Sequence, residues 1–217
     1  MSMRDIIIKT ADMLKERFEG EGSGHDWWHI YRVWQNAKNI AEYEKCDKEI
    51  VELAALLHDI ADWKFNDGDE KAGSRVARQW LREQDAEEEV IVRVCEIIDN
   101  VTFKGAKVTN NMQSIEGMIV QDADRLDAIG AVGIGRAFAY GGFKGREMYN
   151  PKVAHQLHDS FEAYKNSESN TINHFYEKLL FLKDMMNTKR GRELAEGRHE
   201  FMEQFLERFY KEWDGEI

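Results

Sequence analysis

The spacing of apolar residues most strongly limits the folds open to this 217-residue sequence. Apolar side chains recur every three or four residues along almost the whole chain, as they do on one face of an α-helix. No segment alternates apolar and polar residues convincingly enough to predict a half-buried strand. One proline and sixteen glycines also disfavour a β-sandwich with many tight turns. The sequence therefore predicts an all-α fold that forms one domain over residues 1–217.

Capping residues indicate where several of the helices begin. Asp26 and Asp47 each precede a helical apolar pattern and are expected N-caps. Asp85 and Glu88 have the spacing of a capping box that opens a further helix. The remaining predicted elements are helices over residues 6–18, 72–83, 118–134 and about 153–213, the last with short breaks near residues 167–170 and 188–191. Loops are predicted over residues 102–114 and 140–145.

The charge balance limits the classes of partner. The chain has 30 Lys and Arg residues against 41 Asp and Glu residues, which gives a formal net charge of −11. A broad surface for polymeric nucleic acid needs a net basic face, so this class of partner is not expected. A small phosphorylated substrate is compatible with the acidic balance, because it needs only a local positive centre.

The cysteine content and the apolar runs bear on the cellular compartment. Cys46 and Cys95 are the two cysteines, and they do not form a Cys-x-x-Cys pair, which favours a reducing environment. No run approaches the roughly 18 uncharged apolar residues of a membrane span, and the N-terminus lacks the pattern of a signal peptide. We therefore expect a cytoplasmic protein without a membrane partner.

Ionisable residues interrupt the two most apolar helices of the sequence. His58 and Asp59 directly follow the apolar residues 54–57, and Asp124 lies within the helix predicted over residues 118–134. Burying an ionised carboxylate costs several kcal/mol unless it is paired or bound to a metal. His29 offers a second imidazole on another helix. Two imidazoles with two carboxylates suit Mn²⁺, Fe²⁺, Zn²⁺ or Co²⁺ better than Ca²⁺.

Each of these residues also has an ordinary structural interpretation. A single histidine on a helix, such as His29, is more often a surface residue or a hydrogen-bonded core residue than a metal ligand. Asp124 is next to Arg125, and the two can form a simple ion pair. The coincidence of His58, Asp59 and Asp124 within the two most apolar helices favours the metal site.

Three segments that contain these residues occur in a characteristic order. They are HDWWHIYRV, ALLHDI and DADRLDA, at residues 25–33, 55–60 and 122–128. Together they resemble the H…HD…D signature of HD-domain metal-dependent phosphohydrolases, and most closely the small single-domain bacterial members. The resemblance extends to residues 130–136 and 173–179 and so covers most of the chain. It implies a helical bundle with a metal-site core at about residues 25–130 and a helical C-terminal part at about 150–214.

The resemblance also implies roles for individual residues. The ligands of one divalent ion are expected to be His29, His58, Asp59 and Asp124. Mn²⁺ is the favoured ion, and Mg²⁺, Co²⁺, Fe²⁺, Zn²⁺ or Ni²⁺ are alternatives. Some nucleotide-hydrolysing relatives carry an acidic pair shortly after the His-Asp dipeptide, whereas this chain has Ala61 and Asp62 there. The single acid disfavours the mechanism of the alarmone hydrolases.

Asp62 is the predicted residue that orients or deprotonates the attacking water, and Asp127 is a weaker alternative. The candidate phosphate contacts are Arg32, Lys64, Lys144 and Lys178, each of which also fits an ordinary solvated surface cation. His174 is a candidate contact to a leaving group or base, or a packed helix residue. Trp27 and Trp28 directly precede His29, and one of them is expected to line the active site.

The reaction that this family resemblance favours is hydrolysis of a nucleoside or deoxynucleoside triphosphate to the monophosphate and pyrophosphate. The alternatives are a 5′-nucleotidase, a cyclic-nucleotide or alarmone hydrolase, and a catalytically silent HD module that binds a nucleotide. A homodimer is one possible assembly. The sequence leaves open the base and sugar preference, the native metal, the bond that is cleaved and the oligomeric state.

Overall fold

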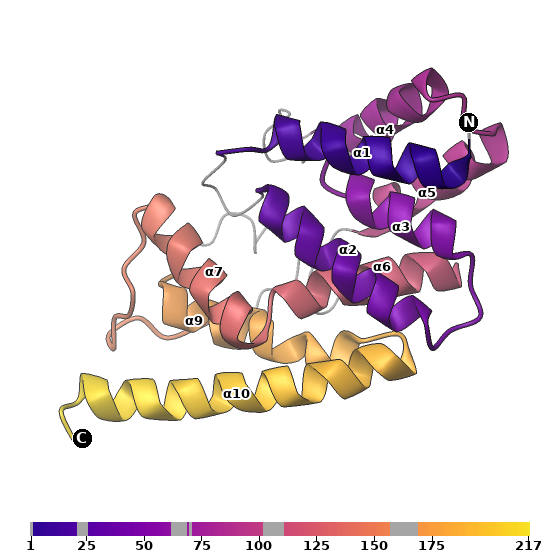
Figure 1. Cartoon of the computed structure of the whole chain (residues 1–217). Coiled ribbons are helices and arrows are strands. Elements are labelled where there is room, and N and C mark those ends of the chain that lie inside the picture. Colours follow the sequence, from indigo (N-terminus) through magenta and orange to yellow (C-terminus); the bar gives the residue numbers. More distant parts are fainter. Residues whose placement is uncertain (1, 21–25, 62–68, 70, 102–110, 157–168) are drawn as a thin grey trace. The chain divides into compact units, whose positions relative to one another are not determined.

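The structure, a computed structural model, describes residues 2–20, 26–61, 69, 71–101, 111–156 and 169–217. These residues form helices and turns, and no β-strand occurs among them, so the all-α prediction is confirmed (Figure 1). They group into two compact units, which divide between Asp124 and Arg125. No helix in the described ranges is long and apolar enough to cross a membrane.

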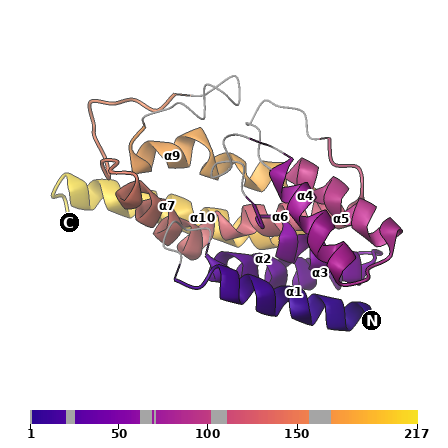
Figure 2. The same ribbon diagram turned by 90° about the horizontal axis from the view of Figure 1, so that it is seen from above.

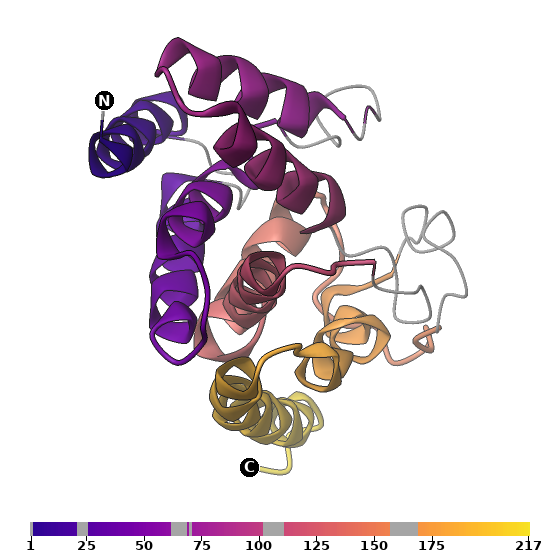
Figure 3. The same cartoon turned by 90° about the vertical axis from the view of Figure 1, so that its right-hand side faces the viewer.

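The first unit is built around a buried central helix. Its elements are α1 (Met3–Arg17), α2 (Trp27–Ala41), α3 (Lys48–Leu57), α4 (Ala72–Glu83), α5 (Glu88–Val101) and α6 (Ile115–Asp127), the last as far as Asp124. Helix α3 contacts α1, α2 and α5, while α4 packs along α5 (Figures 1 and 3). Residues 53–57 of α3 are completely buried. The prediction that this apolar helix lies at the centre of a core is therefore confirmed.

Two predicted N-caps position the helices that carry site residues. The Asp26 carboxylate accepts a hydrogen bond from the His29 amide at 2.8 Å and so begins α2. The Asp47 carboxylate accepts from the amides of Glu49 and Ile50 and begins α3. Because a cap satisfies amides that have no partner within the helix, it sets the residue at which the helix starts.

The predicted capping box of Asp85 and Glu88 is wrong. Helix α5 begins at Glu88 itself, and Asp85 has a left-handed φ of 57°, whereas an N-cap residue is extended. The amide of Ala86 donates to the Leu81 carbonyl at 3.0 Å, so this segment closes the end of α4. Glu88 instead forms ion pairs with arginines of α4.

The second unit contains a long terminal helix and an aromatic core. Its elements are the end of α6, α7 (Gly130–Phe143), α9 (Thr171–Glu177), the short 3₁₀ helices η2 (Leu179–Phe181) and η3 (Lys183–Met185), and α10 (Lys189–Trp213). Helix α7 contacts both α9 and α10 (Figure 2). Phe138, Phe175 and Phe205 come from these three helices, and their ring centroids lie 5.9 to 6.2 Å apart.

One continuous helix over residues 118–134 is not observed. Helix α6 ends at Asp127, and α7 begins at Gly130, whose φ of 75° lies in the left-handed region. A Cβ atom at Gly130 would also lie 2.9 Å from the Cβ atom of Arg198. Glycine fits this break because it has no side chain to clash and adopts positive φ without strain.

Two further boundaries differ from the prediction. Helix α7 continues to Phe143, so the loop predicted over residues 140–145 starts later than expected. Residues 153–156 are not helical, although a helix was expected from 153 onward. The next part of that predicted helix, residues 157–168, lies outside the described residues. The spacing of apolar residues therefore did not predict where α7 ends or where the C-terminal helical part begins.

Candidate metal centre

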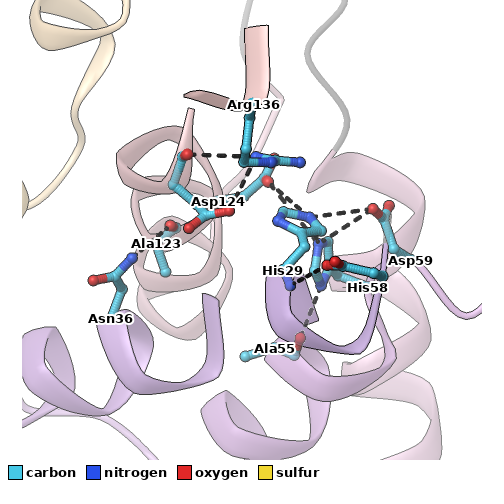
Figure 4. Close-up of polar contacts among 10 residues, drawn as sticks. His29, Asn36, Ala55, His58, Asp59, Ala123, Asp124 and Arg136 are labelled. Carbon is cyan, nitrogen blue, oxygen red and sulfur yellow. Dashed lines mark hydrogen bonds and ion pairs between the residues drawn. The ribbon is translucent and has the colours of Figure 1, made fainter. Parts of the chain in front are cut away.

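Three segments of the first unit bring four predicted ligands together. His29 lies in the first turn of α2, and His58 is the residue that caps the C-terminal end of α3. Asp59 follows His58 in the turn after α3, and Asp124 lies near the end of α6. Figure 4 shows the two aspartates on opposite sides of the pair of imidazoles. We refer to these four residues as the metal cluster.

The distances within the metal cluster fit donors that share one ion. The Nε2 atoms of His29 and His58 are 3.3 Å apart. The Nε2 atom of His29 is 3.4 Å from Asp59 Oδ2 and 3.6 Å from Asp124 Oδ1, and the corresponding distances from His58 are 3.6 and 3.9 Å. Donors bound at about 2.1 Å to one cation lie roughly 3 to 3.5 Å apart. The donor atoms of His29, His58 and Asp59 all lie within 4.8 Å of one another, so these three residues could hold a metal ion.

A backbone carbonyl fixes the orientation of His58. The Nδ1 atom of His58 lies 2.8 Å from the carbonyl oxygen of Ala55. A carbonyl oxygen can only accept a hydrogen bond, so Nδ1 carries a proton, and Nε2 is the nitrogen that faces the other residues of the metal cluster. This arrangement is the one found in metal-binding histidines, whose second nitrogen is held by a carbonyl or carboxylate.

The four residues of the metal cluster differ in how far they are exposed to solvent. His29 and His58 are 1% and 6% exposed, whereas the side chains of Asp59 and Asp124 are 20% and 34% exposed. The imidazoles therefore form the buried part of the site, and the carboxylates lie closer to solvent. Two partly buried carboxylates create a negative potential that favours a cation.

Sequence reasoning missed the hydrogen bond that Asn36 forms. Its side-chain amide donates to the carbonyl oxygen of Ala123 at 3.4 Å, directly before Asp124 (Figure 4). Asn36 lies seven residues after His29, two helical turns along the same face of α2. That spacing was visible in the sequence, but the partner on α6 was not. The contact links the helix of one predicted ligand to the helix of another.

The remaining predicted site residues lie in several parts of the chain. Asp62 and Lys64 lie outside the described residues. Arg32 is half-buried on α2, one turn after His29. In the second unit, Lys144 is exposed with its Nζ atom 5.7 Å from the Tyr140 ring centroid, and Lys178 is half-buried at the end of α9. The roles of these residues in catalysis and phosphate binding stay predictions.

Two other residues of the second unit have clear surroundings. Asp127, the weaker candidate for orienting water, is buried with its carboxylate 3.0 Å from Nη1 of Arg136. This contact supports the role of an ion pair. Burial lowers the pKa of His174 to about 3, with smaller contributions from the positive charges of Lys178 and Arg146. His174 is therefore neutral at pH 7.

Known proteins resemble the chain over nearly its whole length. The HD domain family matches residues 27–129. The chain is 45% identical to Bacillus subtilis YpgQ over 96% of both sequences, and the structure of YpgQ in complex with ADP superposes with a TM-score of 0.73. An HD-superfamily hydrolase from Bacillus thuringiensis is 46% identical, with a TM-score of 0.75 over 98% of this chain and 99% of its own. A Lactobacillus plantarum protein is 34% identical, with a TM-score of 0.86 over 99% of this chain and 100% of its own.

Proposed function

This chain belongs to the HD-domain superfamily, and on that premise we propose that it is a divalent-metal-dependent phosphohydrolase that acts on nucleotides. The favoured reaction is hydrolysis of a nucleoside or deoxynucleoside triphosphate to the monophosphate and pyrophosphate. The observation that carries the proposal is a pair of imidazole Nε2 atoms 3.3 Å apart, with carboxylate oxygens of Asp59 and Asp124 3.4 to 3.9 Å from them.

In this proposal His29, His58, Asp59 and Asp124 hold one divalent ion, with Mn²⁺ favoured. Such an ion supplies an activated water and offsets the negative charge that develops on the phosphoryl group. The Ala55 carbonyl keeps His58 in the tautomer that binds metal. Asn36 supports the position of α6 beside α2 through its contact with Ala123. These contacts preorganise the donors before substrate arrives.

The substrate side of the proposal depends on residues outside the metal cluster. Asp62 orients the attacking water or accepts its proton as the bond to the leaving pyrophosphate breaks. Arg32 is the cation next to His29 on α2 and is assigned a phosphate contact. Lys64, Lys144 and Lys178 are further proposed phosphate contacts. A nucleotide is favoured over other phosphate compounds because the related YpgQ has been crystallised with ADP.

A panel of nucleotides incubated with Mn²⁺ and the purified protein tests this proposal. Chromatography of the products should show nucleoside monophosphate and pyrophosphate in equal amounts, and excess EDTA should abolish the reaction. Release of orthophosphate alone would instead indicate a 5′-nucleotidase or another phosphomonoesterase. Tight nucleotide binding without turnover under Mn²⁺, Co²⁺ or Mg²⁺ would indicate a silent binding module.

A further inference from the structure

Three aromatic side chains gather at the start of α2. The rings of Trp28 and Tyr31 meet edge to face, with centroids 5.9 Å apart and an interplanar angle of 82°. Trp27 also lies beside Tyr31, with the two ring centroids 6.1 Å apart. Trp28 is 59% exposed and Tyr31 is 38% exposed. Large exposed aromatic surface of this kind is typical of binding sites, because it combines a flat apolar face with little conformational freedom.

The position of Trp28 relative to the metal cluster follows from helix geometry. Side chains three or four residues apart on a helix are neighbours on its surface. Arg32 is three residues after His29 and four residues after Trp28, so it is a neighbour of both. On α2, Arg32 therefore lies between the buried His29, a predicted metal ligand, and the exposed indole of Trp28.

This order of chemical groups matches the order of groups in a nucleotide. If the bond next to the α-phosphate is hydrolysed at the metal cluster, the base lies only one sugar away from the reacting phosphorus. We propose that Trp28 stacks on the nucleobase of the substrate, with Tyr31 supporting the indole and Arg32 contacting the phosphates. The inference rests on the proposed function, because it assumes that the phosphates bind at the metal cluster. Stacking accepts any base, so it gives affinity for nucleotides as a class.

Binding of ADP to the Mn²⁺-loaded protein provides the direct test. Trp28→Ala should weaken ADP binding by about 10-fold or more in calorimetry, while Trp28→Phe, which keeps an aromatic face, should stay within about 3-fold of the wild type. Inorganic tripolyphosphate has no base, so its affinity should be the same in all three proteins. In turnover assays, Trp28→Ala should raise KM with little change in kcat.

Tyr43→Ala is the matched control. Tyr43 is 66% exposed and lies just beyond the other end of α2, so its loss should alter none of these quantities. Unchanged ADP binding in Trp28→Ala would overturn the inference. So would equal losses for ADP and tripolyphosphate, because a loss without base dependence indicates a structural effect. Should Trp28→Ala fold poorly, ADP should still quench tryptophan fluorescence in the wild type and much less in Trp28→Phe; equal quenching would overturn the inference.

The test separates this inference from the proposed function. Base-dependent ADP binding through Trp28 without turnover of any nucleotide would support the stacking site and contradict the hydrolase. Turnover of nucleoside triphosphates with the same KM in wild type and Trp28→Ala would support the hydrolase and contradict the stacking site.

Discussion

Buried ionisable side chains are arranged differently in the two compact units. In the first unit, two imidazole Nε2 atoms lie 3.3 Å apart, and carboxylate oxygens of Asp59 and Asp124 lie 3.4 to 3.9 Å from them. In the second unit, guanidinium groups bind individual protein oxygens. Arg125 donates to the Met185 carbonyl, and Arg198 donates to the Leu126 carbonyl.

This difference in arrangement distinguishes side chains that form a binding site from side chains that stabilise the fold, which we call the scaffold. A guanidinium that binds a carbonyl or carboxylate is compensated within the protein, and the pair needs no ligand. Several lone pairs that face one another are compensated best by a cation between them. Burial and charge alone do not distinguish these two cases. The arrangement of the donor atoms does, and in the first unit His29, His58 and Asp59 could hold a metal ion.

The largest effect is expected from removing one side chain of the metal cluster in the first unit. Asp59→Ala removes one carboxylate of the metal cluster and should lower both bound metal and nucleotide turnover, the latter on the order of 1,000-fold. Metal analysis and a Mn²⁺-supplemented assay measure these two quantities. Asp12→Ala, which removes an exposed carboxylate of α1, is the control and should retain both. Full activity of metal-free Asp59→Ala protein would show that the cluster is not the catalytic centre.

A smaller effect, on stability, is expected from breaking a pair in the second unit. Asp127→Asn leaves the guanidinium of Arg136 without its carboxylate partner and should lower the free energy of unfolding by about 3 kcal/mol. Urea denaturation measures the change. The metal-free Asp59→Ala protein provides the contrast, with an expected change of less than about 1 kcal/mol. Equal destabilisation by the two substitutions would remove the distinction between site and scaffold.

The smallest effect concerns a neutral histidine of the second unit. The pKa of His174 is lowered to about 3, so as pH falls from about 6.5 toward 3 the unfolded chain binds a proton that the folded chain does not. This group therefore destabilises the fold increasingly over that range. His174→Gln removes the penalty and should improve stability relative to wild type by about 1 to 2 kcal/mol more at pH 5 than at pH 7.5. Urea denaturation at the two pH values gives the comparison.

His155→Gln controls for the loss of a histidine, because His155 is exposed. If His174→Gln and the wild type lose stability in parallel between pH 7.5 and pH 5, His174 is protonated as easily in the folded protein as in the unfolded chain. The contrast between charge arrangements in the two units would then not extend to this residue.

The residues of the metal cluster could be predicted because ionisable side chains are unusual in such apolar segments. His58, Asp59 and Asp124 are ionisable groups within or directly after apolar helices, which is costly without a partner, and the structure places all three beside His29. The caps Asp26 and Asp47 were predictable for a related reason, because a short polar side chain before an apolar helix has a local role. In both cases the signal lies within a few residues of sequence.

Features that depend on backbone conformation or distant partners were not predictable in this way. The apolar pattern continues across the break before Gly130, because it does not depend on the left-handed φ of one residue. Asp85 has the side chain of an N-cap but a backbone that closes the preceding helix. The contact between Asn36 and Ala123 joins positions 87 residues apart, and no local pattern connects them.

The division of the chain between Asp124 and Arg125 has an evolutionary consequence. Asp124 is the last residue of the first unit, and none of the four donors of the metal cluster comes from the second. Mutations in the second unit therefore leave the donor set intact. The sequence of the second unit can therefore diverge between related chains without the loss of any of these four side chains.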